Sequence, residues 1–235
     1  CAAEKVLAEG VRNFALLFVV GEERNSAGAY HAAKHGRGSK YLINGEPTEN
    51  RLAVGSKGAL RLEVTAQGRM AHSAYPELGD SAIEKLLDAL AKIRQAPLLT
   101  DPLLGDSTLN IGTLSGGRAP NVIPDQAKAE LLVRLVDDGH STIETLTRAA
   151  GDRVKVEPVL RIPAVRLGTL PGFETMVAKY TTDIPAFGGA WGEPFLIGPG
   201  TIHVAHTSEE RVPKKQLLEA VDLYARMVRE LTARG

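Results

Sequence analysis

The chain has 235 residues, in which 28 Lys and Arg balance 28 Asp and Glu. This balance gives no net field that favours nucleic acid or anionic lipid, so partners selected by bulk charge are excluded. The single cysteine, Cys1, excludes an internal disulfide framework and predicts a reducing, cytoplasmic location, and no apolar run approaches the roughly 18 residues of a membrane span.

The opening residues, CAAEKVLAEG, have helical spacing, with Ala2, Val6 and Leu7 on one side and Gly10 as a stop. The chain thus begins with Cys1 inside an element. We expect that further sequence preceded residue 1 in a longer polypeptide.

An alternation of strand and helix follows. FALLFVV, residues 14–20, is a continuous apolar run and predicts a strand buried on both faces. AGAYHAAKHG predicts a short helix over residues 27–36, and KYLING predicts a strand over residues 40–45. Strand, helix and strand in this order are typical of a parallel α/β sheet.

The pattern changes at about residue 55. Strands are predicted over residues 59–68, 107–117, 125–136 and 153–162, because apolar residues recur there with strand spacing. Amphipathic helices are predicted over residues 80–95, with Asp80 as cap, and residues 140–151, with Ser141 as cap. The order β-α-β-β-α-β matches the ferredoxin-like plan, so residues 55–162 are predicted to be an inserted domain.

The α/β character returns after residue 162. GFETMVAKYT, residues 172–181, predicts a helix, PFLIGPG is an apolar run closed by a Gly-Pro-Gly turn, and a long amphipathic helix starts at Pro213. The predicted fold class is α/β: a catalytic domain with a mostly parallel sheet, residues 1–54 and 163–235, interrupted by a ferredoxin-like α+β domain.

Polar groups follow three of the predicted strands. Glu22 and Glu23 follow the first, Glu46 the second, and the run after residue 200 contains His203 and His206. Ligands of parallel sheets bind beyond the carboxyl ends of the strands. Carboxylates and an imidazole suit Zn²⁺, Mn²⁺ or Co²⁺, and a spare glutamate can act as general base; solvated loops are the alternative interpretation.

Two further features are interpreted as structural. His31 and His35 lie one helical turn apart, a spacing that can hold a metal ion, but the Ala-rich, Lys-containing context favours a solvated face. Asp183 in TTDIPAF could contact the site through a neighbouring loop, but a cap or turn role is favoured.

Five stretches occur in one order along the chain: FVVGEE, NGEPTE, GRMAHSAYPELGDSA, GGRAPNVIPDQAKAELLVR and IGPGTIHVAHTSEERV. Together they resemble motifs of the zinc-dependent amidohydrolase and metallopeptidase family that contains acetylornithine deacetylase, succinyl-diaminopimelate desuccinylase, carboxypeptidase G and aminoacylase. The resemblance implies hydrolysis of the amide of an N-acyl amino acid or small peptide. It also implies two metal ions, Zn²⁺ or else Co²⁺ or Mn²⁺, and a homodimer formed through the inserted domain.

The resemblance also implies roles for single residues. Glu22 resembles the general acid/base and Glu23 a metal ligand. Glu46 resembles a terminal carboxylate ligand and His206 a terminal imidazole ligand. His72 resembles the histidine that steadies the oxyanion, often from the partner subunit. The positions that resemble substrate contacts are Asn121, Arg134, Gly198 and Gly200.

The chain departs from the family pattern at its start, because an upstream His-x-Asp region and a bridging aspartate are not present. We expect the chain alone to be inactive and its sheet to have an open edge. The alternative to the hydrolase is an inactive fragment or degraded paralogue that acts through self-association of the inserted domain. A hydrolase with one metal on Glu23, Glu46 and His206 is a third hypothesis, and the acyl group of the substrate stays open.

Overall fold

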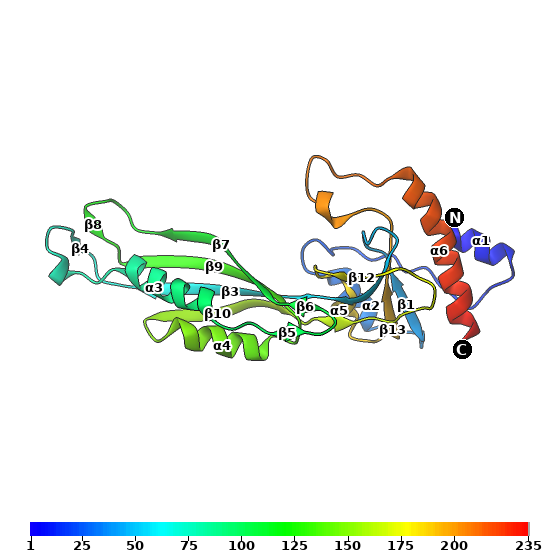
Figure 1. Cartoon of the computed structure of the whole chain (residues 1–235), viewed down its shortest axis with the longest axis horizontal. Helices are drawn as coiled ribbons and strands as arrows, with labels where there is room; N and C mark the ends of the chain where they lie inside the picture. Colours follow the sequence, from blue (N-terminus) through cyan, green and yellow to red (C-terminus); the bar gives the residue numbers. More distant parts are fainter. Residues whose placement is uncertain (235) are drawn as a thin grey trace. The chain divides into compact units, whose positions relative to one another are not determined.

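Two units make up the computed structural model, which describes residues 1–234 (Figure 1). The terminal unit contains residues 1–56, 165–178 and 182–234, and the inserted unit contains residues 57–164 with 179–181. Each unit has its own hydrophobic core.

The inserted unit is a four-stranded antiparallel sheet with two helices. The strands stand in the order β10-β3-β9-β7, which is the spatial order of a ferredoxin-like fold. Figure 1 shows both helices along the same side of this sheet. The elements are β3 (Gly58–Gln67), α3 (Ala82–Gln95), β7 (Thr108–Gly116), β9 (Gln126–Leu135), α4 (His140–Ala150) and β10 (Val154–Ile162).

Period-two alternation builds the core of the inserted unit. Leu60, Leu62 and Val64 of β3 are fully buried, and the residues between them face away from the helices. Leu86 and Ile93 of α3 pack into the same cluster. The β3–β9 register runs without a bulge from Gly58↔Leu135 to Gln67↔Gln126, so the two central strands are paired over their full length.

Short elements lie at the two ends of this sheet. At one end β4 (Ala71–His72) pairs with β8 (Val122–Ile123), beside a 3₁₀ turn η1 (Pro76–Leu78). β5 (Thr100–Asp101) pairs with β6 (Gly105–Asp106) elsewhere in the same unit.

The terminal unit is built on a mixed sheet of order β1-β13-β2-β11, with β12 also on β2. The pairs β1–β13 and β2–β12 are parallel, and β2 is antiparallel to β13 and β11. The strands are β1 (Tyr41–Asn44), β2 (Leu52–Ser56), β11 (Val165–Arg166), β12 (Thr175–Ala178) and β13 (Glu193–Leu196).

Helices complete the terminal unit. Met227 and Leu231 of the last helix pack on Leu52 and Phe195 of the sheet. The last helix also lies beside α1, where the Glu9 carboxylate accepts from Arg229 at 2.5 Å (Figure 1). The helices are α1 (Ala2–Ala8), α2 (Ala27–Ala33), α5 (Ile184–Phe187), the 3₁₀ turn η2 (Ile202–Val204) and α6 (Lys214–Ala233). Over residues 1–234, no helix is both long and apolar enough to cross a lipid bilayer.

The α/β class is confirmed, but the first predicted strand is wrong. Residues 14–20 join no sheet of the described chain, and Phe18 and Val20 are 88% and 76% exposed. An apolar run is suited to a buried strand, but a strand forms only where another backbone accepts its hydrogen bonds.

Three smaller predictions are also wrong. Residues 172–181 contain strand β12 instead of a helix. The cap of α3 is Ser81, whose Oγ accepts from Glu84 N at 3.2 Å, because Asp80 instead pairs with Lys85. The N-cap position of α4 is Gly139, and no side chain caps it.

Candidate metal and catalytic site

A tight turn presents the adjacent carboxylates Glu22 and Glu23. The carbonyl of Gly21 accepts three successive amides, those of Arg24, Asn25 and Ser26, at 2.9 to 3.2 Å. Gly21 has φ +84°, which a residue with a side chain adopts only with strain. The turn therefore depends on this glycine, and it leaves both glutamates exposed.

A second turn carries Glu46 and is held against the Gly-Pro-Gly turn. The amide and hydroxyl of the buried Thr48 both bond the Gly198 carbonyl, and the Thr48 hydroxyl also accepts from Gly198 N at 3.0 Å. Glu49 N donates to the Gly200 carbonyl at 2.8 Å. A Cβ on Gly198 would lie 2.5 Å from the Glu46 carbonyl oxygen, so this approach requires glycine. Gly198 and Gly200 are buried, and their predicted contact with substrate stays a prediction.

His206 meets Glu23. Its Nε2 lies 3.1 Å from Glu23 Oε2, and its backbone amide donates to Glu210 Oε2 at 3.0 Å. His206 has φ +62°, an uncommon conformation for a residue with a side chain. Strain of this kind often accompanies a functional position, which agrees with the role that the resemblance implies.

Acidic groups crowd around these turns and perturb one another. Burial, with repulsion from Glu22, Asp183 and Glu23, raises the pKa of Glu46 to about 7. Partial desolvation and the neighbouring Glu23 and Asp183 also raise the pKa of Glu22, and His206 opposes the rise. Crowded carboxylates with raised pKa values typify functional sites.

Sequence reasoning favoured a cap or turn role for Asp183 over a place at the site. This residue is 3% exposed, and its Oδ1 is buried without a hydrogen-bond partner in the described chain. It occupies the N-cap position of α5, as predicted, but its side chain makes no cap hydrogen bond. The sequence signal was weak, because an Asp before Ile-Pro is also what a helix start requires. An orphaned buried carboxylate oxygen among other acids lacks a positive partner.

The remaining candidates lie in the inserted unit, at opposite ends of its sheet. His72 pairs with Val122 in the β4–β8 ladder, and Ser73 N donates to the Asn121 carbonyl at 3.0 Å, so His72 and Asn121 are neighbours. Arg134 lies near the other end of β9, where it pairs with Ala59. At about 3.4 Å per residue, Arg134 is roughly 27 Å from the start of β9.

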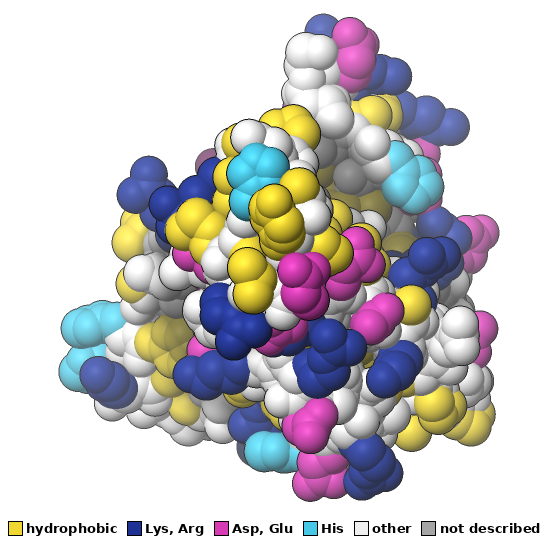
Figure 2. All heavy atoms as spheres, turned by 90° about the vertical axis from the view of Figure 1, so that its left-hand side faces the viewer, with side chains coloured by type: hydrophobic (Ala, Val, Ile, Leu, Met, Phe, Trp, Pro, Cys, Tyr) yellow, Lys and Arg dark blue, Asp and Glu magenta, His cyan; other side chains and the backbone are white. Residues whose placement is uncertain are grey.

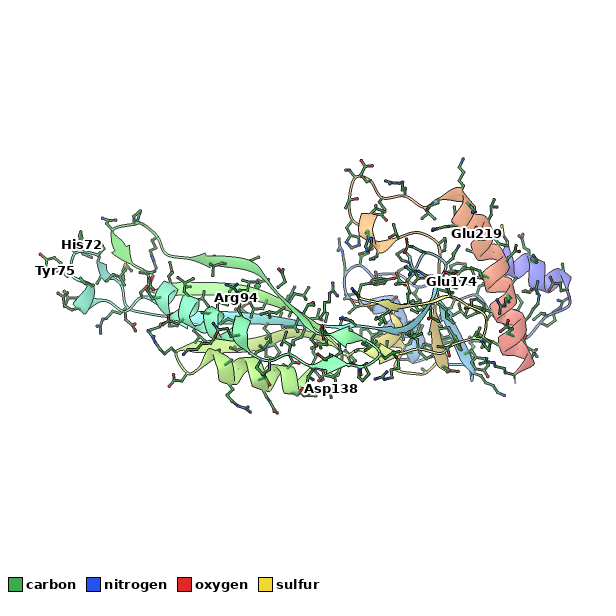
Figure 3. The ribbon with its side chains drawn as sticks, in the orientation of Figure 1. His72, Tyr75, Arg94, Asp138, Glu174 and Glu219 are labelled. Atoms are coloured by element: carbon green, nitrogen blue, oxygen red, sulfur yellow. The ribbon has the colours of Figure 1, made fainter. Side chains whose placement is uncertain are left out.

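His72 has a defined tautomer. Its Nδ1 accepts the Ala74 amide at 3.1 Å, so the hydrogen of the neutral ring lies on Nε2. Tyr75 lies 6.4 Å from it between ring centroids, and Figure 3 shows both side chains at the same end of the unit. Figure 2 looks onto this end, where hydrophobic side chains gather; the exposed ones here include Met70, Tyr75 and Leu78.

Arg134 is half-buried and has no hydrogen bond or ion pair in the part of the chain that the structure describes. Burial lowers the pKa of its guanidinium. A desolvated guanidinium without a partner is poised to accept a carboxylate through its bidentate fork.

The donor chemistry at Glu23, Glu46 and His206 fits a divalent transition metal ion. Imidazole nitrogen and carboxylate oxygen are ligands of Zn²⁺ and Mn²⁺. Within residues 1–234, however, no group of three or more such side chains is close enough to hold an ion. His206 and Glu23 are in contact, and the charge of Glu23 is one of the causes that raise the pKa of Glu46.

Comparison with known proteins identifies the inserted unit first. Residues 54–157 match the family model of the peptidase dimerisation domain of M20 peptidases. A Schizosaccharomyces pombe protein described as containing a peptidase M20 domain is 41% identical over 92% of this chain and 55% of its own length. The chain is a homologue of the M20 peptidases. A probable carboxypeptidase of Ajellomyces dermatitidis is 36% identical over 94% of this M20 homologue and 57% of its own length.

Solved structures agree on the fold. A Staphylococcus aureus tripeptidase superposes on this M20 homologue with a TM-score of 0.72 at 19% identity, over 90% of this chain and 63% of its own. A Bacillus subtilis protein described as a dinuclear metal-binding peptidase of the M20 family gives a TM-score of 0.64 at 17% identity, again over 90% and 63%. The M20 homologue spans about half the length of the curated relatives it matches.

Proposed function

We propose that the chain contributes to a metal-dependent hydrolase that cleaves the amide of an N-acyl amino acid or small peptide. The observation that carries this proposal is the group of crowded acids Glu22, Glu46 and Asp183, which interact with one another and with His206. A divalent cation would relieve this repulsion and satisfy the orphaned Asp183 oxygen.

Glu23, Glu46 and His206 would hold the metal, with Zn²⁺ as the first choice and Co²⁺ or Mn²⁺ as alternatives. The resemblance implies two ions in all. When bound, such an ion polarises the scissile carbonyl and lowers the pKa of a water to near neutrality.

Glu22 would act as the general acid and base. Its raised pKa favours a group that takes the proton of the attacking water and returns it to the leaving amine. The Nε2 hydrogen of His72 would donate to the oxyanion that develops on the carbonyl.

Arg134 and Asn121 would bind the substrate. The unpaired guanidinium of Arg134 suits an α-carboxylate, so substrates with a free carboxylate are favoured over amidated ones. Deacetylase, desuccinylase and carboxypeptidase reactions all meet this requirement.

The test is a hydrolysis screen of N-acetyl and N-succinyl amino acids and dipeptides with Zn²⁺ or Co²⁺, using the polypeptide that carries these residues. Glu22→Gln is expected to lower kcat by about 10²- to 10⁴-fold while the bound metal is retained. The matched variant Glu23→Gln is expected to lose metal. Metal loss from Glu22→Gln would contradict the assignment and show that the two glutamates have the opposite roles.

Two copies would form a homodimer through the edge strand β7 of the inserted unit. The other edge strand, β10, is protected by Lys155, Glu157 and Pro158, whereas a register shift interrupts the pairing of both edge strands. β7 has nine residues, TLNIGTLSG, with neither charge nor proline. An unprotected edge of this kind pairs readily with another strand.

The same edge favours the second candidate function, a non-catalytic chain that acts by self-association. Leu114 on β7 and Val159 on β10 are 56% and 49% exposed, so they are a matched pair of positions for substitution on the two edge strands. Leu114→Lys is expected to convert a dimer to a monomer in sedimentation, while Val159→Lys leaves the dimer intact. Dimer formation without metal binding and without hydrolysis would favour the non-catalytic function.

The separation of His72 and Arg134 suggests that the two serve one substrate from different copies. Mixing two inactive variants, His72→Ala and Arg134→Ala, is then expected to restore about a quarter of the activity, because random pairing makes half of the dimers mixed and each mixed dimer has one intact site. If the mixture recovers no activity, His72 and Arg134 act in a site of the same copy.

We also propose a cytoplasmic location, since the one cysteine leaves no internal disulfide, and cell fractionation tests it.

A further inference from the structure

A pair of histidines lies on α2, where no role has been assigned. His31 is on the helix and His35 directly follows its last turn, with the ring centroids 4.8 Å apart and the ring planes tilted by 49°. Both side chains are exposed. Neither imidazole has a hydrogen bond or ion pair among residues 1–234.

The spacing of the rings fits chelation of one ion. With metal–nitrogen bonds of about 2.1 Å and the ion on each lone pair, two imidazole centroids lie roughly 4.6 to 5.3 Å apart for angles at the ion between about 90° and 109°. The observed 4.8 Å falls inside this range. We propose that His31 and His35 together bind a divalent transition metal ion, with water completing its coordination.

The backbone that carries the two rings is held in place. His35 N donates to the Ala32 carbonyl at 2.9 Å, and Trp191 Nε1 donates to the same carbonyl at 3.0 Å. Ala29 and Ala32 pack against Phe187 on the buried face of the helix. A Cβ on Gly36 would lie 2.5 Å from the Ala190 carbonyl oxygen, so the chain leaves the helix in close contact with a neighbouring loop. This packing fixes the buried face of α2, and it therefore holds the backbone of His31 and His35 in place before an ion binds.

The choice of ion follows from the ligands. Imidazole suits Zn²⁺, Cu²⁺ and Ni²⁺, and the affinity of a nitrogen site rises from Ni²⁺ to Cu²⁺ and falls again at Zn²⁺. Both histidines bind as neutral rings, and Lys34, which is exposed between them, adds a repulsive charge. The site is therefore expected to bind Cu²⁺ and Ni²⁺ more weakly than a closed four-ligand site binds Zn²⁺.

The pair is separate from the acidic group proposed for hydrolysis. Neither His31 nor His35 contributes to the perturbation of Glu22 or Glu46. A metal count on this chain would therefore include one ion that has no connection with hydrolysis.

The test is a Ni²⁺ titration of the tag-free chain by calorimetry, followed by electron paramagnetic resonance with Cu²⁺. All proteins carry Cys1→Ser, because the exposed thiol would itself bind these ions. His31→Ala and His35→Ala are each expected to weaken Ni²⁺ binding by at least about tenfold, since loss of even an outer partner of a ligand lowers affinity about 10- to 100-fold. The Cu²⁺ spectrum of the parent is expected to show coupling to two nitrogens.

Two controls separate this site from others. His140→Ala removes an exposed unpaired histidine of the inserted unit and is expected to leave Ni²⁺ binding unchanged. His206→Ala disables the site of the proposed hydrolase, so it removes any ion held there, and it is expected to leave the Ni²⁺ binding that depends on His31 and His35 unchanged. Absence of Ni²⁺ and Cu²⁺ binding by the parent, or binding to the His206→Ala protein that survives His31→Ala with His35→Ala while circular dichroism shows an intact fold, would overturn the proposal.

Discussion

The inserted unit and the terminal unit differ in how far each covers its own apolar residues. In the inserted unit the inward side chains of β3, such as Leu60 and Leu62, are completely buried by α3, α4 and β9. In the terminal unit the run of residues 14–20 includes Leu16 and Phe18, which are 66% and 88% exposed.

The difference lies in where the contacts come from. The inserted unit is nearly continuous in sequence, so each strand finds its neighbours within about a hundred residues of chain. The terminal unit joins distant segments, as the contact between Thr48 and Gly198 shows, and residues 14–20 find no strand within the described chain. Hydrophobicity thus shows that a segment can be buried, and only the rest of the fold shows whether it is.

The largest expected contrast is between two truncations to alanine. Leu62→Ala removes a side chain with no exposed surface and is expected to lower the free energy of unfolding by about 2 to 5 kcal/mol. Phe18→Ala removes a larger side chain that is mostly exposed, and is expected to change it by less than about 0.5 kcal/mol. Urea unfolding followed by circular dichroism measures both. A comparable loss from Phe18→Ala would mean that residues 14–20 are buried in solution.

A smaller effect is expected from pH, and it arises in the terminal unit. The pKa of Glu46 rises from its ordinary value of 4.5 to about 7 on folding. Between these values the folded carboxyl holds a proton that the unfolded one has lost, so stability is expected to fall as pH rises from about 4.5 to 7. The loss is at most about 3 kcal/mol.

Urea unfolding of the metal-free protein across this pH window measures the effect. Glu46→Gln is the control, because an amide of similar shape does not titrate, and its stability is expected to lack this fall. A parent protein whose stability rises over the window would contradict the assigned burial of Glu46.

Periodicity predicted the inserted unit well because its residues face either a core or solvent. The alternation in ALRLEVTAQ and in QAKAELLVRL gave strands β3 and β9, and the apolar stripe of AIEKLLDALAKIRQ gave α3. Here local spacing and tertiary burial agree.

The terminal unit was harder to predict, since its contacts override local preference. The stretch GFETMVAKYT predicts a helix, but its residues TMVA pair with β2 and form the parallel strand β12. Likewise Asp183 resembled a helix cap, and only the fold brought it near Glu22 and Glu46. The chemical type of the acidic residues was visible in the sequence, while their proximity was not.

The smallest expected contrast concerns the two helix starts of the inserted unit. Ser81→Ala removes the hydroxyl that accepts Glu84 N and is expected to cost about 1 kcal/mol. Ser141 lies inside α4 and donates to Asp137 Oδ2 instead of capping an amide, so Ser141→Ala is expected to cost only a few tenths of a kcal/mol. Thermal unfolding of the two variants side by side resolves the difference. Equal losses would mean that the Ser141 hydroxyl stabilises the start of α4 as much as the Ser81 hydroxyl stabilises the start of α3.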